Sequence, residues 1–558
     1  MLKMLKNNFS VLVRARFLLC SLILLAGFVI YETAVLYGKK WSAVQPLENV
    51  MTLGIYLFVT MMFISYEYLR KFYNSGVSEV LQTLDKKNKN TVAAFLVLVL
   101  YSFILCVILA LIVIAEFLFF KISDPNHEYI RHIIICIFLN IYLVMQLAIM
   151  IGGSLATLKN RIVIYSIMTM MTLLSSPFAE SMAYSIDMSD LTNHGSAGEM
   201  AFKFISYFYI IPRFHMKWIT RPEFGEPVLL YRVFIILFWS FFFATIMLIV
   251  RKKKCISIVV SGMLCVMMFV AYSLPASKMD QKLDGYQNGI PDIIYAKSDK
   301  YDEQIEPADY EIKEYDMKID IRSSLKAEIA MTVSKTLDQY HMTLYRKYKI
   351  SEVKDQEGSK LDFDQSGDYV TVFNRNGSDI KKIIIKIMGN SSDCYANYQG
   401  CYLPGFYLYY PRAGFLSVYD TTYGNIKPNF VDANTLFKVE VSPEGKYISN
   451  LKKEDNEYIG RCDGFTLLKG FYKEKNLVNG NVLVYPYLDE FVVHDGKKSE
   501  EECWKENFDF SSEQLKKDNI KDSMIFMDPD VLNGKEYKAC GNRQIFVNVG
   551  GSFYVSDK

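Results

Sequence analysis

The stretch TVAAFLVLVLYSFILCVILALIVIAEFLFF, residues 91–120, decides the fold of this chain because it contains only one charged residue, Glu116. A helix needs about 20 apolar residues to cross a bilayer, so this stretch is long enough to span a membrane. Further apolar segments cover residues 17–37, 51–68, 133–153, 162–178, 233–250 and 255–274, and none follows. The sequence therefore predicts a membrane α-helical bundle of about seven transmembrane helices over residues 17–275.

Basic residues predict the orientation of this bundle. They gather before the first apolar segment and after the second, fourth and sixth, which are all loops on one side. The clusters are Lys3, Lys6, Arg14 and Arg16; Arg70, Lys71, Lys86, Lys87 and Lys89; Lys159 and Arg161; and residues 251–254. Because basic loops stay inside, we expect a cytoplasmic amino terminus and, after seven crossings, a carboxyl-terminal half outside the cell.

The two halves of the chain carry opposite charge. Residues 276–558 hold 38 Lys and Arg against 46 Asp and Glu, a net charge of −8, whereas residues 1–275 carry +10. The acidic half could attract a cationic peptide, or it could simply present a solvated surface, since salt screens charges over about 8 Å. We expect the lipid membrane and proteins as partners, and no nucleic acid.

After Pro275 the apolar residues alternate with polar ones, which is typical of half-buried strands. The alternation is clear at Tyr310, Ile312, Tyr315, Met317 and Ile319, and turn signals such as Asn376-Gly377 separate such runs. We predict an extracytoplasmic, antiparallel all-β domain of the sandwich or saddle type. Its predicted parts are a linker at 276–309, the β domain at 310–490 and a mixed α/β tail at 491–558.

Cysteines offer one candidate pair in this exterior half. Cys394 and Cys401 could close a short disulfide loop within SDCYANYQGC, because an exterior compartment can be oxidising. With Cys462, Cys503 and Cys540 the exterior count is five, so at least one thiol should be free. No CxxC pair accompanies them, and we predict no metal site.

Two carboxylates lie within predicted spans. Glu32 and Glu116 each sit near the outer end of a span, and an intramembrane carboxylate is costly to bury. They could line a path for a cationic substrate, or they could reach the outer headgroups. Asn140 and Gln146 in the fourth span are expected to bond to neighbouring helices.

Several catalytic motifs are missing from the sequence. It contains no GxxxxGK[ST] phosphate loop, no HExxH zinc helix, no GxSxG nucleophile elbow and no GxGxxG dinucleotide loop. We therefore predict that the chain is not an enzyme and carries no cofactor of its own.

Two segments in the first half give the membrane domain a recognisable layout. Residues 1–16 place Leu2, Leu5 and Phe9 on one helical stripe, as expected of a helix lying in the inner membrane interface, although a simple basic flank to the first span is the alternative. The run RKFYNSGVSEVLQTLDKKNKN, residues 70–90, predicts a short cytoplasmic helix. With the exterior loop before the sixth span, this layout resembles the permease subunits of ABC exporters of the type-2 class.

This resemblance implies partners and a docking site. It implies that a coupling helix docks on separate cytoplasmic ATPase subunits, which bind ATP and Mg, and that a second permease chain, alike or different, completes the transporter. The residues implied for docking are Gly76, Val77, Ser78, Val80, Leu81 and Leu84.

The exterior half resembles the amino-terminal β domain of aminopeptidase N-like zinc peptidases. The resemblance rests on YEIKEYDMKIDI at 310–321, on HMTLYRKYKISEVKDQEGSKLDFD at 341–364, and above all on GCYLPGFYLYYP at 400–411. The family's glycine-x-methionine-glutamate-asparagine motif and its zinc helix have no counterpart here. Substrate binding at a strand edge, or in an aromatic cleft around Tyr402, Leu408 and Tyr410, is a further expectation.

Together these features predict a permease subunit of an ATP-driven exporter in a bacterial cell membrane, moving a peptide or antimicrobial-type substrate. The alternative is a membrane-anchored peptide receptor or sensor with an inactive peptidase-like exterior domain. An active peptidase would require zinc binding, for which the sequence shows no ligands.

Overall fold

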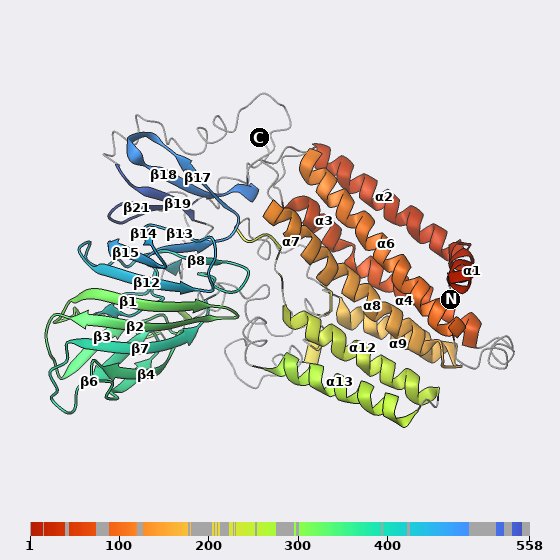
Figure 1. The fold of residues 1–558 in the computed structure, drawn as a ribbon, viewed down its shortest axis with the longest axis horizontal. Coiled ribbons are helices and arrows are strands. Elements are labelled where there is room, and N and C mark those ends of the chain that lie inside the picture. Colours follow the sequence, from red (N-terminus) through yellow and green to blue (C-terminus); the bar gives the residue numbers. More distant parts are fainter. Residues whose placement is uncertain are drawn as a thin grey trace. The chain divides into compact units, whose positions relative to one another are not determined.

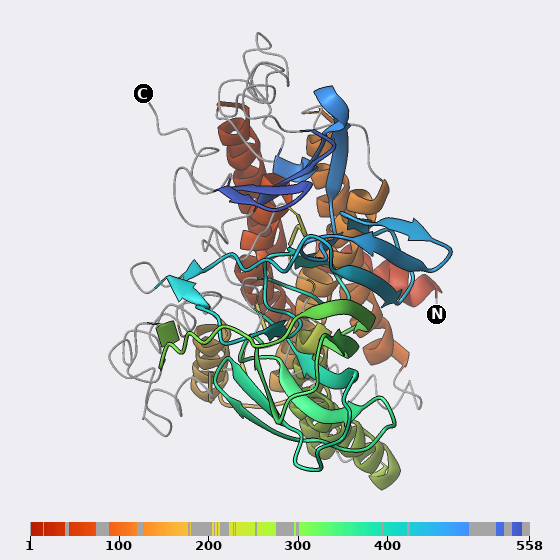
Figure 2. The same ribbon diagram turned by 90° about the vertical axis from the view of Figure 1, so that its left-hand side faces the viewer.

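The computed structural model describes residues 2–14, 16–38, 44–73, 89–119, 127–176, 179, 204–205, 207–208, 210–211, 223–226, 228, 230–251, 254–274, 295–296, 301–391, 394–420, 425–489, 521–528 and 538–548. These residues form two compact units (Figures 1 and 2). The helical unit comprises Met1–Thr220, Gly225–Gln281 and Glu490–Asp495. The β unit comprises Arg221–Phe224, Lys282–Asp489 and Gly496–Lys558.

The labelled α-helices and the π-helix belong to the helical unit. They are α1 (Leu2–Val13), α2 (Arg16–Gly38), α3 (Gln45–Thr52), α4 (Gly54–Tyr73), α6 (Lys89–Phe119), α7 (His127–Ile137), the π-helix η1 (Phe138–Tyr142), α8 (Leu143–Leu155), α9 (Arg161–Ser175), α12 (Leu230–Val250) and α13 (Cys255–Ser273). In Figure 1 the long helices α2, α6 and α8 run along one another.

Five of the described helical segments are long and apolar enough to cross a membrane, which indicates a membrane protein. They are Gln45–Lys71, Asn90–Leu118, His127–Leu155, Leu230–Val250 and Cys255–Ser273. A sixth is the pair Lys3–Val13 and Leu18–Ala34, whose axes differ by 68°, if it is counted as one span. The predicted fifth span forms only the 15-residue helix α9, shorter than a full crossing requires. The count of seven therefore stays a prediction.

Close packing between α4 and α8 depends on glycine. A side chain at Gly152 would overlap Ser65 Oγ and the Met62 carbonyl oxygen, and it would come within 2.9 Å of Tyr66 N. Ser65 Oγ in turn donates a hydrogen bond to Met62 O at 3.0 Å. Small residues let helix backbones approach closely in this way.

The β unit is built from several sheets of mixed direction. The seven-stranded sheet has the order β14 (Lys452–Glu454), β15 (Glu457–Arg461), β12 (Leu436–Ser442), β1 (Ile312–Ile321), β2 (Leu325–Val333), β7 (Lys382–Gly389) and β4 (Lys349–Asp355). The four-stranded sheet has β5 (Asp362–Ser366), β6 (Tyr369–Phe373), β3 (Gln339–Thr343) and β9 (Arg412–Ala413). The three-stranded sheet has β13 (Ile448–Ser449), β16 (Leu467–Lys469) and β8 (Cys401–Leu403).

The remaining strands form a five-stranded and a two-stranded sheet. The first has the order β17 (Tyr472–Asn476), β18 (Val482–Pro486), β19 (Met524–Asp528), β21 (Gln544–Asn548) and β20 (Lys538–Cys540). The second pairs β10 (Tyr419–Asp420) with β11 (Asn425–Ile426), and the single-turn 3-10 helices η2 (Val478–Gly480) and η3 (Tyr487–Asp489) flank β18.

The structure changes three expectations about this half. The sheets are not purely antiparallel, because β1 pairs with β12, and β19 with both β18 and β21, in parallel. Long connections separate these partners, and parallel pairing requires such connections. The five-stranded sheet also crosses the predicted boundary at residue 490, and residues 491–520 lie outside the described residues.

The third change concerns the predicted linker at 276–309. Its described end belongs to the β unit, because Glu306 and Phe415 exchange two main-chain hydrogen bonds of 2.9 Å. Tyr301 packs 5.1 Å from the ring of Tyr419 in the same region. Residues 301–309 are therefore part of the folded unit.

Candidate functional site: a buried polar cluster among the helices

Three polar residues recur every four positions along α7 and η1. His132, Cys136 and Asn140 lie on one face because residues four apart are neighbours on a helix. All three are buried although the surrounding sequence is apolar. A buried polar face inside an apolar helix requires partners from other elements.

Glu226 and Arg232 supply these partners. Arg232, in the first turn of α12, donates from Nη1 to Asn140 Oδ1 at 2.6 Å and from Nη2 to the carbonyl of Ile210. Cys136 Sγ lies 3.4 Å from His132 Nε2 and donates to the carbonyl of Glu226 at 3.8 Å. We call His132, Cys136, Asn140, Glu226 and Arg232 the buried polar cluster.

A π-helical turn places Asn140 in this cluster. Residues Phe138–Tyr142 form a π-helix between α7 and α8, which inserts one extra residue into the turn. Such single π-turns are frequent at functional sites. Asn140 lies within this turn and accepts the hydrogen bond from Arg232.

The cluster can hold a polar or anionic group. The guanidinium of Arg232 is permanently charged and offers several donors in one plane, and its side chain is only 2% exposed. The imidazole of His132 and the thiol of Cys136 add groups that can donate or accept. Within the described ranges, no group of three His, Cys, Asp or Glu residues could hold a metal ion.

Glu32 and Glu116 lie in a different place. Thr33 Oγ1, next to Glu32 in α2, donates to Glu116 Oε1 at 2.5 Å and so joins α2 to α6. Both carboxylates are partly exposed, and neither contributes to the buried polar cluster. Gln146 also bonds a neighbouring helix, donating to Ser102 Oγ at 2.7 Å. The substrate path through Glu32 and Glu116 stays a prediction.

The predicted coupling helix falls outside the described residues. The structure does not describe residues 74–88. This range contains all the residues predicted for docking, which are Gly76, Val77, Ser78, Val80, Leu81 and Leu84. Their docking role stays a prediction that rests on the sequence.

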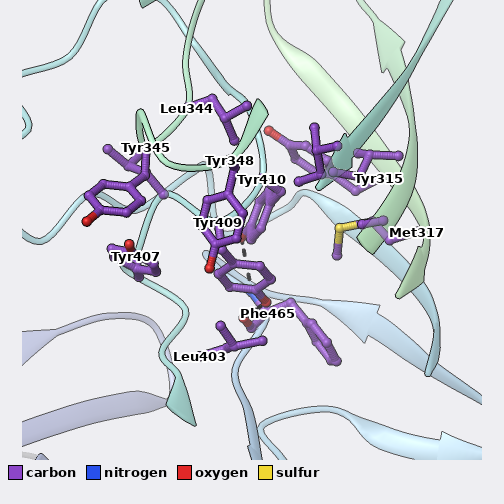
Figure 3. Packing of buried hydrophobic residues seen from close by; sticks show 14 of the residues in the cluster. Tyr315, Met317, Leu344, Tyr345, Tyr348, Leu403, Tyr407, Tyr409, Tyr410 and Phe465 are labelled. Atoms are coloured by element: carbon purple, nitrogen blue, oxygen red, sulfur yellow. Dashed lines mark hydrogen bonds between the residues drawn. The ribbon is translucent and has the colours of Figure 1, made fainter. Parts of the chain in front are cut away.

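The aromatic run at 400–411 does not line an open cleft. Tyr402, Leu408 and Tyr410 are completely buried in the core of the β unit. Figure 3 shows Tyr410 among other side chains of this core. The Tyr410 ring lies 5.1 Å from that of Tyr315 and 5.8 Å from that of Phe437. The expectation of an open cleft lined by these three side chains is wrong, because each of them is completely buried.

Arg412 is buried in the same core. Its Nη2 donates to Gly405 O at 2.6 Å, and its guanidinium lies 3.9 Å from the centre of the Tyr410 ring. A cation over an aromatic face is attracted by the ring quadrupole. Arg412 therefore links two parts of the aromatic run from inside.

Cys394 and Cys401 do not form the predicted disulfide, since both are free, buried thiols. Cys401 Sγ donates to the carbonyl of Leu467 at 3.6 Å, and burial raises the pKa of this thiol to about 12. The turn between the two cysteines is closed by other means. Asn397 N donates to Gly400 O at 2.9 Å, and Asn397 Oδ1 accepts from Gln399 N at 2.8 Å.

The bond of Asn140 to a neighbouring helix was predicted, but the cluster as a whole was missed, partly because two of its members fall at the edges of apolar segments. Arg232 immediately precedes the segment at 233–250, and His132 immediately precedes that at 133–153. Both therefore resembled loop residues at the membrane surface. The spacing of four residues between His132, Cys136 and Asn140 was the signal that could have indicated a shared helical face.

Comparisons with solved structures find partial similarity to zinc peptidases. Native yeast LTA4 hydrolase is similar over 45% of this chain and 43% of its own length, with 13% identity and a TM-score of 0.29. The M1 zinc metallopeptidase from Deinococcus radiodurans is similar over 34% of this chain and 50% of its own length, with 11% identity and a TM-score of 0.23. No protein-family model matches the chain, and no curated protein matches it in sequence.

Proposed function

We propose that this chain is the membrane-spanning subunit of an ATP-driven exporter of the type-2 ABC class. A separate cytoplasmic ATPase would bind ATP and Mg, and a second permease chain would complete the transporter in a bacterial membrane. The β unit would lie outside the cell. The substrate is proposed to be a peptide or an antimicrobial-type compound.

The observation that carries this proposal is the buried guanidinium of Arg232 among the helices. Charged groups inside membrane helices are costly, and they mark substrate or ion pathways more often than structural features. A helix bundle that serves only as an anchor gains nothing from such a group. The buried polar cluster therefore favours a transporter over an anchored receptor.

The amino-terminal helices also support the proposal. The axes of Lys3–Val13 and Leu18–Ala34 differ by 68°, so the two helices do not form one straight rod. An amphipathic helix in the membrane interface followed by a crossing helix has this arrangement. This is the layout for which the sequence resembles type-2 exporters.

The test is to purify the tagged full chain from its native membrane and identify the companions by mass. We expect an ATP-hydrolysing subunit, and we expect Val80→Asp with Leu84→Asp to reduce its recovery roughly tenfold, since charges would disrupt an apolar docking face. Gln82→Asp, on the other side of the predicted coupling helix, is the matched control. Absence of any ATPase, or equal recovery with all variants, would reject the proposal.

A second arm of the same experiment addresses the buried polar cluster. Arg232→Gln should leave the ATPase bound but lower ATP turnover by the purified complex roughly tenfold, if transport uses the cluster. Gly262→Ala, where an added methyl group would meet nothing within 4 Å, controls for mutation in a helix. Unchanged turnover in Arg232→Gln would instead fit an anchored receptor.

A further inference from the structure

A short segment from between α9 and α12 is part of the β unit. Residues Arg221–Phe224 belong to this unit although they precede α12 and α13 in the chain. Phe224 is 4% exposed and is a member of the aromatic core of the β unit. The β unit therefore encloses a piece of chain from outside its own continuous sequence.

Two hydrogen bonds from the β unit hold the main chain of this segment. Phe471 N donates to the carbonyl of Glu223 at 2.7 Å, and Gln399 Nε2 donates to the carbonyl of Phe224 at 2.8 Å. The Phe224 ring lies 5.1 Å from that of Tyr395. Main-chain hydrogen bonds combined with a place for one side chain are the usual way in which proteins bind extended peptides.

Two glycines of the β unit leave room for Glu223 and Phe224. A methyl group at Gly470 would overlap the Glu223 carbonyl oxygen and lie 3.2 Å from Phe224 Cδ1. The three atoms nearest to that position all belong to Glu223 and Phe224. At Gly400 a methyl group would lie 2.5 Å from Phe224 Cδ1. We call Tyr395, Gln399, Gly400, Gly470 and Phe471 the Phe224 site.

Strand pairing brings the two sides of this site together. In the pairing of β16 with β8, Lys469 lies opposite Cys401. This register places the turn at 395–400 beside residues 469–471. The turn is held by Asn397, whose Oδ1 accepts from Gln399 N and Gly400 N. The site is therefore formed by the β unit and not by the segment that fills it.

We propose that the Phe224 site is a peptide-binding site and that Glu223–Phe224 occupies it as an internal ligand. The ligand class is an extended peptide with an aromatic residue, since the contacts reach two successive carbonyls and one ring. The inference rests on the proposed function in one respect, because it makes such a peptide the exported substrate. A tethered segment acts at an effective concentration in the millimolar range, so an external peptide binds well only when the segment is weakened.

The test uses the dye-labelled hexapeptide Arg-Pro-Glu-Phe-Gly-Glu, the sequence of residues 221–226, and the full chain in detergent. Phe224→Ala should bind this peptide at least about tenfold more tightly than the unmodified chain, because its own segment competes poorly. The double variant Phe224→Ala with Gly470→Ala should lose this binding, since the added methyl group takes the place of the peptide carbonyl. A peptide with alanine in place of phenylalanine should bind about tenfold more weakly.

Three results would overturn the inference. They are no binding to a folded Phe224→Ala chain, equal binding of the alanine peptide, and no effect of Gly470→Ala. Hydrogen exchange of β1 and β2 shows whether the Phe224→Ala chain is folded. If it is unfolded, the same assay is carried out with Phe224→Leu. Recovery of the ATPase companion does not depend on this peptide assay. The peptide can therefore fail to bind while the ATPase is recovered, and the peptide can bind while no ATPase is recovered.

Discussion

The helical unit exposes many large apolar side chains on its outer surface, whereas the β unit exposes few of them. In α13, Ile256 is 69% exposed and Met263 is 67% exposed, whereas in the described β unit the exposed large apolar side chains are Ile305 and Met388. Burial of apolar surface away from water stabilises both units, but the helical unit also leaves many large apolar side chains exposed. The helical unit requires lipid to cover its outer surface, which is why its composition differs.

The two units also differ in how they bury polar groups. The helical unit gathers a few into the buried polar cluster, where side chains from several helices meet. The β unit buries side chains such as Arg412 and Gln544, and it also contains tyrosine hydroxyls that donate to main-chain carbonyls, such as Tyr315 to Pro411 at 2.9 Å and Tyr409 to Phe465 at 2.5 Å. Dispersed hydroxyls suit a structural core, whereas a concentrated cluster suits a site.

The strongest test of this contrast is Tyr410→Ala in the β unit. It removes a fully buried ring and the aromatic partner of Arg412, and we expect a loss of about 3–5 kcal/mol in the stability of this unit. Hydrogen exchange of the full chain in detergent would report this loss in β1 and β2. The control is Ile305→Ala at an exposed position, which should change protection little. Equal protection in both variants would contradict a structural role for the aromatic run.

A smaller effect is expected from Gly152→Ala in the helical unit. The added methyl group would overlap backbone and side-chain atoms of α4, and overpacking of this kind costs about 1–3 kcal/mol. Thermal unfolding of the purified chain, followed in the helical signal, measures it. Gly262→Ala meets open space and is the matched control. If both glycines tolerate alanine equally, the close approach of α4 and α8 is not required.

The smallest expected effect concerns Asp463, whose carboxylate joins β21 to the rest of the β unit. Asp463 accepts from Asn542 N and from Gln544 Nε2, while burial raises its pKa. A raised pKa means that the folded unit favours the protonated form. The stability that this group contributes is therefore complete below its ordinary pKa of about 3.9 and is lost as the pH rises through the raised value.

Melting of the β unit in the unmodified chain and in Asp463→Asn, compared across acid to neutral pH, tests this sign. The unmodified chain should lose stability relative to the variant as pH rises, by a shift on the order of 1–3 °C. A difference between the two chains that does not vary with pH would show that Asp463 does not ionise in this range.

The sequence predicted the elements whose pattern is local. The alternation at Tyr315, Met317 and Ile319 corresponds to buried positions of β1, and the apolar runs at 91–120 and 255–274 correspond to α6 and α13. Period and length are properties of consecutive residues, so neighbouring residues are sufficient to identify such elements.

What could not be predicted depends on residues far apart in the chain. Tyr402 and Tyr410 looked like an exposed aromatic surface, because nothing nearby in sequence shows that sheets cover them. The sequence gives no local sign that Arg232 is buried, because its partner Asn140 lies 92 positions earlier. The Phe224 site likewise needs Gln399, 175 positions away.

The membership of Glu223 and Phe224 in the β unit also bears on how many times the chain crosses the membrane between residues 224 and 301. If the β unit lies on one side of the bilayer, as proposed, residue 224 and residue 301 lie in the same compartment. The chain between them passes through α12 and α13, which are joined by a hydrogen bond from Thr245 Oγ1 to Ser261 Oγ at 2.9 Å. We therefore propose that the chain crosses the lipid an even number of times between these residues, as two crossings by α12 and α13 would give.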